Sequence, residues 1–133
     1  MQEHIDPYSI FPEPDYGSTL SVPVNGVAHP GIYVGDGFVI DNSRKRGGVR
    51  YIHMNEFRNG LKFTNHGVIG TLPPAQIVRN AHSALGKDYD FLLYNCKDFV
   101  REARGQSWQT VLIKAGVTFG VVCGGFYLAR RAS

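Results

Sequence analysis

Hydrophobic and polar residues alternate in the first clearly patterned part of the chain. In residues 18–28, Leu20, Val22 and Val24 recur at every second position before Asn25-Gly26. A period of two is typical of a half-buried β-strand, and an Asn-Gly dipeptide is typical of a tight turn. The pattern therefore predicts a first strand that ends in a turn.

The next patterned segment reads HPGIYVGDGFVID, from His29 to Asp41. It has β-prone runs on both sides of a glycine-rich loop at 35–37, which predicts a β-hairpin. With a three-residue loop, Val34 pairs with Phe38. Asp41 is then the diagonal neighbour of His29 on the same face of the hairpin, roughly 7–8 Å away by backbone. We therefore expect the imidazole and the carboxylate to meet.

Shorter runs complete the predicted fold. Residues 49–53 and 61–64 have the composition of further strands. Pro73-Pro74 predicts the start of a helix that ends before Gly86. Its apolar face carries Ile77, Val78, Ala81 and Leu85. Strands followed by packed helices predict an α+β domain, with a small antiparallel sheet packed on helices.

The segment YNCKDFV at 94–100 has the features of a helix start. Asn95 is a favourable N-cap, Asp98 falls in the first turn, and Gly105 is a typical terminator. Cys96 then lies at the helix N-terminus, where an anion is stabilised by about 0.3–1 kcal/mol, which favours a thiolate. A buried structural cysteine is the alternative, because free cysteines are among the most buried residues.

Cys96, His29 and Asp41 together supply a nucleophile, a base and an orienting group. A thiol becomes a useful nucleophile at neutral pH when an imidazole favours its thiolate and a third polar group holds the imidazole. Pro30 cannot donate to a sheet ladder, which predicts that His29 lies at a strand end or on an edge strand. An active site can be open at such a place.

The two segments together, HPGIYVGDGFVI and LGKDYDFLLYNCKDFV, resemble the lecithin:retinol acyltransferase-like family. This family includes the small phospholipase A/acyltransferases, is related to picornaviral H-box/NC proteins, and belongs to the NlpC-type cysteine hydrolase superfamily. The resemblance covers approximately residues 18–108. It implies Cys96 as nucleophile and His29 as general base. The family usually has a second histidine at the position of Asp41 and NCEHF in place of NCKDF, so Asp98 also departs from its pattern.

The resemblance implies a permuted NlpC-type, papain-like arrangement and a function. We expect a membrane-associated thiol acyltransferase or phospholipase A that forms an acyl-thioester on Cys96. Backbone N–H groups at the start of the cysteine helix are the expected oxyanion donors. One alternative is an NlpC-type amidase or peptidase with the same chemistry. The other is a non-catalytic interaction protein that keeps the H-box/NC fold.

Composition and charge narrow the classes of protein and of partner that the sequence fits. The 133-residue chain is 43% hydrophobic and 12% aromatic, as expected for one globular domain with tails. Its two cysteines suggest neither a disulfide framework nor a zinc site, so no metal or cofactor is expected. A net charge of +3 is compatible with an anionic membrane surface and is weak evidence for nucleic acid, which we do not expect as a partner.

The remaining polar motifs have ordinary interpretations. His53, His66 and His82 show no metal-ligand spacing, so structural or surface roles are favoured for each. The basic run at 43–50 has the composition to touch phosphate headgroups or to act as a localisation signal. Such a run is usually a solvated loop.

The ends of the chain differ from its centre. Residues 1–17 predict an extended acidic arm without a core pattern, or simply a flexible terminus, and show no secretory signal. Residues 109–133 include a hydrophobic segment from Val111 to Ala129, which as a helix is about 28 Å long, close to the thickness of a bilayer core. Its glycines recur every four residues and favour helix association in lipid. They are Gly116, Gly120 and Gly124. We therefore expect a hydrophobic C-terminal helix as a membrane anchor, with the catalytic domain in the cytoplasm; a buried terminal helix is the alternative.

Overall fold

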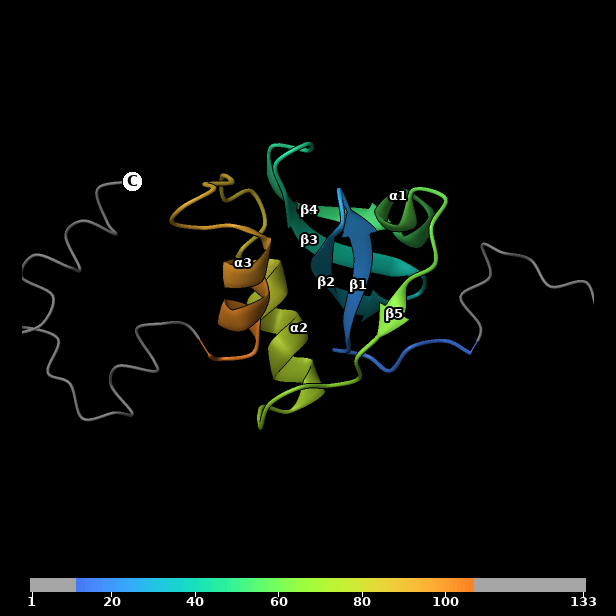
Figure 1. The fold of residues 1–133 in the computed structure, drawn as a ribbon. Helices are drawn as coiled ribbons and strands as arrows, with labels where there is room; N and C mark the ends of the chain where they lie inside the picture. The colour runs from blue at the N-terminus through green and yellow to red at the C-terminus, as the bar shows by residue number, and fades with distance from the viewer. Residues whose placement is uncertain (1–11, 107–133) are drawn as a thin grey trace, which may run out of the picture.

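The computed structural model describes residues 12–106. This part of the chain is an α+β fold with a five-stranded antiparallel sheet in the order β4-β3-β2-β1-β5 (Figure 1). The strands are β1 (Thr19–Val24), β2 (Val27–Gly35), β3 (Phe38–Ser43), β4 (Gly48–His53) and β5 (Thr64–Asn65). The helices are α1 (Met54–Arg58), α2 (Pro74–Ser83) and α3 (Cys96–Ala103). The predicted α+β class and antiparallel sheet are confirmed.

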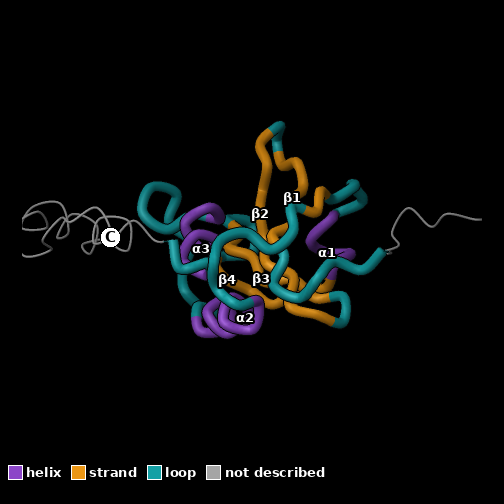
Figure 2. The backbone as a smooth tube through the Cα atoms, turned by 90° about the horizontal axis from the view of Figure 1, so that it is seen from below, coloured by secondary structure: helices purple, strands orange, loops and turns teal. Residues whose placement is uncertain are grey.

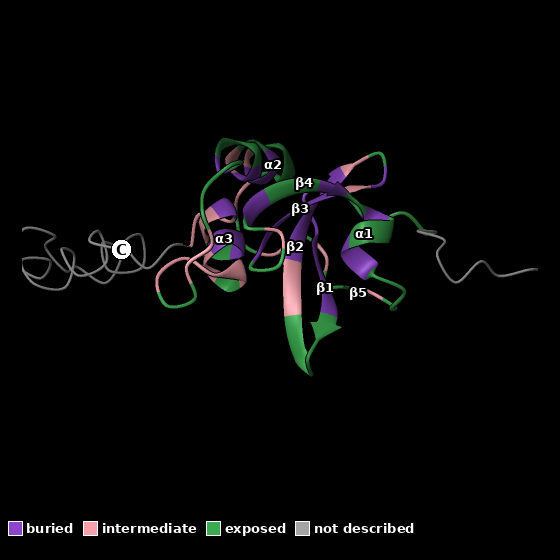
Figure 3. Ribbon diagram, turned by 90° about the horizontal axis from the view of Figure 1, so that it is seen from above, coloured by how far each residue is buried: buried purple, intermediate pink, exposed green. Residues whose placement is uncertain are grey.

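The first two strands form a hairpin, and the predicted turn at Asn25-Gly26 joins them. Both residues have positive φ, at 51° and 78°, which asparagine and glycine tolerate better than other residues. The tip of this hairpin is exposed, whereas the rest of β1 and β2 is buried or half-buried (Figure 3). The prediction of a strand at 18–28 holds as far as Val24, where the chain turns.

The β2–β3 hairpin has the predicted register but a different loop. Gly31 pairs with Asp41, as the sequence pattern requires. Phe38, however, pairs with Gly35 rather than with Val34, and the register shifts between Tyr33 and Gly35. An Asp-Gly turn with positive φ at both positions matches the twist of the strands, and the extra residue becomes a bulge.

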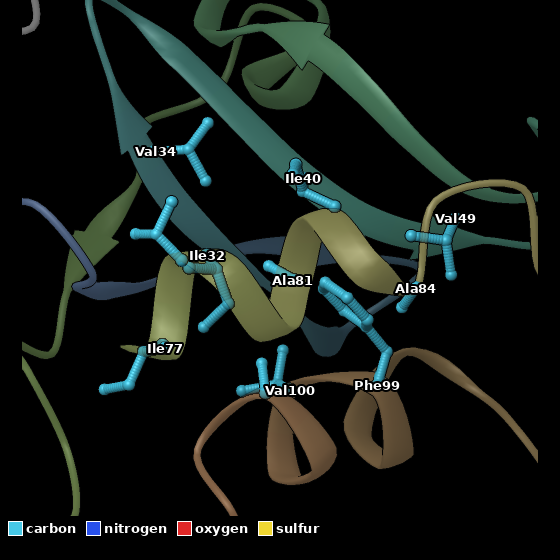
Figure 4. Close-up of a cluster of buried hydrophobic side chains, with 11 residues drawn as sticks. Ile32, Val34, Ile40, Val49, Ile77, Ala81, Ala84, Phe99 and Val100 are labelled. Carbon is cyan, nitrogen blue, oxygen red and sulfur yellow. The ribbon is translucent and has the colours of Figure 1, made fainter. Parts of the chain in front are cut away.

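Helices α2 and α3 cover one face of the sheet, as the ribbon and the tube views both show (Figures 1 and 2). The side chains between these two helices and the sheet form the larger hydrophobic core (Figure 4). The sheet contributes Ile32, Val34, Ile40 and Val49, α2 contributes Ile77, Val78 and Ala81, and α3 contributes Phe99, Val100 and Ala103. The opposite face carries a second cluster that includes Phe57 of α1.

Leu85 departs from the predicted face of α2. Helix α2 ends at Ser83, so helical spacing does not continue as far as Leu85, which is 40% exposed. Ala84 is buried in its place. The chain then turns back against β4: the N–H of Val49 donates to Lys87 O at 2.9 Å, and a Cβ on Gly48 would lie 2.2 Å from the same oxygen.

The region between β4 and α2 was predicted least well. A strand at 61–64 is wrong for most of its length, because β5 comprises only Thr64–Asn65. Helix α1 was not predicted. His53 caps it, since the His53 Nδ1 accepts a hydrogen bond from the N–H of Asn55 at 3.0 Å.

The two predicted terminal segments lie mostly outside residues 12–106. The described part of the acidic arm contacts the sheet: Gly17 N donates to Tyr33 O at 2.9 Å, and the Tyr33 hydroxyl donates to Glu13. The predicted C-terminal anchor, residues 109–133, is outside the described part. Within residues 12–106, none of the helices has the length and apolar character needed to cross a membrane.

Candidate active site

The predicted meeting of His29 and Asp41 is present. Their side chains lie on one face of the β2–β3 hairpin, and the Nε2 of His29 is 2.7 Å from Oδ2 of Asp41. Asp41 is fully buried, and the His29 side chain is 12% exposed. The imidazole is therefore held against the carboxylate and keeps limited access to solvent. The Phe57 ring of α1 packs beside it, with 5.9 Å between ring centroids.

The position of His29 in the sheet differs from the expectation. β2 is the central strand of the sheet, not an edge strand, and His29 pairs with Val22 of β1. On the other side, the ladder with β3 ends at Gly31–Asp41. Pro30 follows His29 and has no N–H to donate. His29 therefore lies in the part of β2 that extends past its last pair with β3. From there its side chain contacts Asp41.

Helix α3 brings Cys96 to this pair. Cys96 is a free, half-buried cysteine at the first residue of the helix. Burial is the largest influence on the His29 pKa and lowers it, but hydrogen bonds to Asp41 and Cys96 and the charges of both groups raise it, to about 9. Because Nε2 is engaged by Asp41, Nδ1 is the ring nitrogen left for the thiol. The raised pKa favours the imidazolium form of His29 at neutral pH, and an imidazolium beside a thiol is the usual setting of a reactive cysteine.

Asn95 is the N-cap of α3, as predicted, and it forms a capping box with Asp98. Its side-chain oxygen accepts from the N–H groups of Lys97 and Asp98, at 3.0 and 3.2 Å. The Asp98 carboxylate in turn accepts from the N–H of Asn95 at 3.0 Å. Asp98, where the resembling family has a histidine, is therefore committed to the helix cap. The N–H groups of Lys97 and Asp98, two of the expected oxyanion donors, therefore already donate to Asn95. Of the N–H groups at the helix start, that of Cys96 remains as the candidate oxyanion donor.

Asn42 joins the two halves of the site, and sequence reasoning missed it. It is fully buried in β3, next to Asp41, and its Nδ2 donates to the carbonyls of Tyr94 and Asn95 at 2.9 and 3.2 Å. These two bonds hold the residues before Cys96 against the strand that carries Asp41. An isolated asparagine in a β-prone run gives no signal for such a contact.

Arg46 is a second residue that sequence reasoning missed as part of the site. It lies in the basic loop between β3 and β4, and its Nη2 donates to the Asp41 Oδ2 that also binds His29. Its side chain is only 19% exposed, so it is not a solvated member of that loop. The sequence does not indicate this contact, because the loop contains several cations and their spacing does not distinguish one from another.

An open groove of about 580 Å³ lies between the β3–β4 loop and the segment that precedes α3, and its volume is within the usual range of small-molecule sites. It is lined by Arg44, Gly47, Asp88, Tyr89 and Phe91. Burial raises the pKa of Tyr89, the charge of the nearby Cys96 raises it further, and Arg44 lowers it. Tyr89 is therefore a groove residue close enough to Cys96 to be affected by its charge. Phe91 is 67% exposed, and the next residue along the chain, Leu92, is 77% exposed.

The other histidines lie away from this site, in the exposed positions favoured by the sequence. His53 caps α1, His66 contacts the hydroxyl of Ser21 at 2.7 Å, and His82 lies beside the ring of Tyr51. In the part of the chain that the structure describes, no group of three or more His, Cys, Asp or Glu residues could hold a metal ion.

Comparison of the chain with protein-family models and with curated proteins finds no match. The resemblance to the lecithin:retinol acyltransferase-like family therefore stays a prediction that depends on the motifs around His29 and Cys96.

Proposed function

We propose that this protein is a cysteine-dependent acyl-transfer enzyme in which Cys96 is the nucleophile, His29 moves the proton and Asp41 orients the ring. One observation carries the proposal: His29 is held by the buried Asp41 carboxylate and also interacts with the thiol of Cys96 at a capped helix start. Nucleophile, base and orienter in such contact are typical of acyl transfer. In this proposal the α+β fold is a permuted NlpC-type arrangement, with the histidine strand before the cysteine helix.

In the first half of the reaction, the Cys96 thiolate attacks the carbonyl carbon of an ester. A C–S bond forms, and the carbonyl π electrons move to the oxygen, where in this proposal the N–H of Cys96 donates to the oxyanion. The intermediate then expels the alcohol. The imidazolium of His29 gives its proton to the departing oxygen, and an acyl thioester remains.

In the second half, the neutral His29 accepts a proton from water or from an acceptor alcohol or amine. The oxygen or nitrogen of that acceptor attacks the thioester carbonyl, and the C–S bond breaks. The acyl product leaves, and the thiolate and imidazolium are restored. Asp41 holds the ring in one orientation through both halves.

A lipid ester is the substrate class that we propose. The groove combines a guanidinium with aromatic rings, and the exposed Phe91 in its lining, with the exposed Leu92 that follows in the chain, suits an acyl chain or the surface of a bilayer. The sequence adds the hydrophobic segment 111–129, which we propose as a membrane anchor whose glycines allow self-association. We also propose that the protein associates with a membrane and that its catalytic domain lies in the cytoplasm.

Mass spectrometry of the intact full-length protein tests the reaction and the substrate class together. The protein is incubated with vesicles of mixed phospholipids, and in parallel with an activated short-chain acyl ester. We expect a mass increase equal to one acyl group on the wild type and none on Cys96→Ala. Cys96→Ala should keep the same circular dichroism spectrum, because the thiol is small and half-buried.

Each outcome of this experiment decides between the functions. Acylation by the activated ester but not by phospholipid would keep the thiol chemistry and remove the lipid substrate, which favours an amidase or peptidase. No adduct and no turnover with either reagent would favour a non-catalytic interaction protein. Equal acyl release by the wild type and Cys96→Ala would rule out the nucleophile.

A further inference from the structure

Two cations share one oxygen of a buried carboxylate. Oδ2 of Asp41 accepts from Nε2 of His29 and from Nη2 of Arg46, while Oδ1 has no hydrogen-bond partner among the described residues. Arginine and carboxylate commonly pair through two parallel hydrogen bonds. Here the guanidinium of Arg46 instead donates to Oδ2, the same oxygen that the imidazole of His29 contacts. The two cations therefore act on the same part of Asp41.

Arg46 has Asp41 as its main anionic partner in this part of the chain. The nearest other carboxylate is Glu56 of α1, whose Oε2 lies 4.0 Å from Nη1 of Arg46. Glu56 is 56% exposed, so solvent screens that interaction. Asp41 is fully buried, where an uncompensated charge is costly. The contact between Arg46 and Asp41 is thus the stronger of the two.

We propose that Arg46 is a positioning residue for the acyl transfer: it divides the Asp41 carboxylate between guanidinium and imidazole, which keeps His29 oriented toward Cys96 and limits how tightly Asp41 holds the imidazolium. The catalytic consequence rests on the proposed function. The effect on His29 itself does not, because it can be observed in a protein without turnover.

The expected direction follows from the charges around His29. Asp41 faces the ring from β3 and Cys96 faces it from α3, while Phe57 of α1 adds no charge. Arg46 acts from the β3–β4 loop and is in turn faced by Glu56. Without the charge of Arg46, Asp41 interacts with His29 alone, which favours the imidazolium. The pKa of His29 then rises above its value of about 9, and the ring becomes a weaker acid toward the leaving alcohol.

Nuclear magnetic resonance titration of the His29 ring in the full-length protein tests the proposal. Arg46→Gln keeps a hydrogen-bonding side chain but removes the charge, and we expect the midpoint to rise by about one pH unit. Arg46→Lys keeps the charge on a shorter side chain with different geometry, so its midpoint should rise less. Lys45→Gln is the matched control, since it removes a cation from an exposed position in the same loop and should leave the midpoint unchanged.

Three results would overturn the proposal: an unchanged midpoint in folded Arg46→Gln, an equal rise in Lys45→Gln, or a rise in Arg46→Lys as large as that in Arg46→Gln. If Arg46→Gln does not fold, Arg46→Met removes the same charge and takes its place in these comparisons. If the enzyme is active, the alkaline limb of its pH–rate profile should move with the NMR midpoint. If no acyl transfer is detected while the midpoint rises in the expected order, the proposed function fails and the effect of Arg46 on His29 stands.

Discussion

The two halves of the candidate site are held in place in different ways. His29 and Asp41 belong to neighbouring strands, and the pairing of Gly31 with Asp41 fixes their relative position through the backbone. Cys96 belongs to a helix that makes no sheet ladder, and the side chains of Asn42, Asn95 and Asp98 determine where the helix begins. The acid–base pair is therefore set by strand register, whereas the nucleophile is set by a few polar contacts. Substitutions should affect the two halves separately.

The largest expected effect is on the sheet half. Asp41→Asn keeps the shape of the side chain but no longer presents a carboxylate to His29, so we expect kcat/KM for an acyl ester to fall by about 10³–10⁴-fold. Asp41→Ala should also be severely impaired. Asp41→His, which restores the residue of the resembling family, should recover part of the activity. Equal activity in wild type, Asp41→Ala and Asp41→His would place the orienting group elsewhere.

The second prediction concerns the pH dependence of stability. The pKa of His29 is raised from 6.5 to about 9, so folding favours the imidazolium. This contribution is fully present below pH 6.5 and is lost as the pH rises through 9. At 1.36 kcal/mol for each pH unit, it amounts to at most about 3 kcal/mol. Urea unfolding at pH 6 and pH 9.5 should show a larger loss for wild type than for His29→Gln, and equal losses would contradict the assignment.

The third prediction separates the helix half from general destabilisation. Asn42→Ala leaves the carbonyls of Tyr94 and Asn95 without their donor and should reduce the free energy of unfolding by about 1–3 kcal/mol. Because Cys96 is then less well placed, we expect activity to fall by about 10–100-fold. Asn80→Ala is the matched control: its Nδ2 donates to Ala103 O at the other end of α3.

Asn80→Ala should reduce stability to a similar extent and leave kcat/KM within about threefold of wild type, since the start of the helix is untouched. Urea titrations and steady-state kinetics of both variants make the comparison. If the two variants lose activity equally, the loss reflects stability alone, and Asn42 has no particular role in placing the cysteine.

The smallest effect is expected at the helix cap. Asp98→Ala removes the acceptor for the N–H of Asn95 and should lower the free energy of unfolding by about 1 kcal/mol. Activity should change only a few-fold, because Asp98 acts on the helix and not on substrate. Asp98→Asn keeps a hydrogen-bond acceptor, so its free energy of unfolding should lie between those of the wild type and Asp98→Ala. A loss of activity as large as that of Asp41→Asn would instead give Asp98 a part in the chemistry.

The sequence predicted the features that depend on local pattern. Alternation of apolar residues placed β1 to β4, the spacing across the hairpin placed His29 beside Asp41, and cap chemistry placed Cys96 at the start of α3. These are short-range properties, in which each residue type has a strong conformational or pairing preference.

Long-range contacts could not be predicted in this way. The contact of Arg46 with Asp41, which sets it apart from the other cations of its loop, is not visible in the sequence, and Asn42 is recognisable only once α3 lies against β3. The short β5 and the one-turn α1 also lack a pattern long enough to indicate a period. At these positions the local sequence has no strong conformational preference, and packing in three dimensions determines the structure.

The close approach at Gly48 has a consequence for how this scaffold could be diversified. No side chain fits there, because the carbonyl of Lys87 occupies the space and φ is +136°. Residues 86–88 therefore cannot move away from or along β4 without losing the fit. The neighbouring Phe91 and Leu92 are exposed and free of that constraint. A library that varies Phe91 and Leu92 while keeping Gly48 should change ligand preference and preserve the fold, whereas insertions at 86–88 should be rejected.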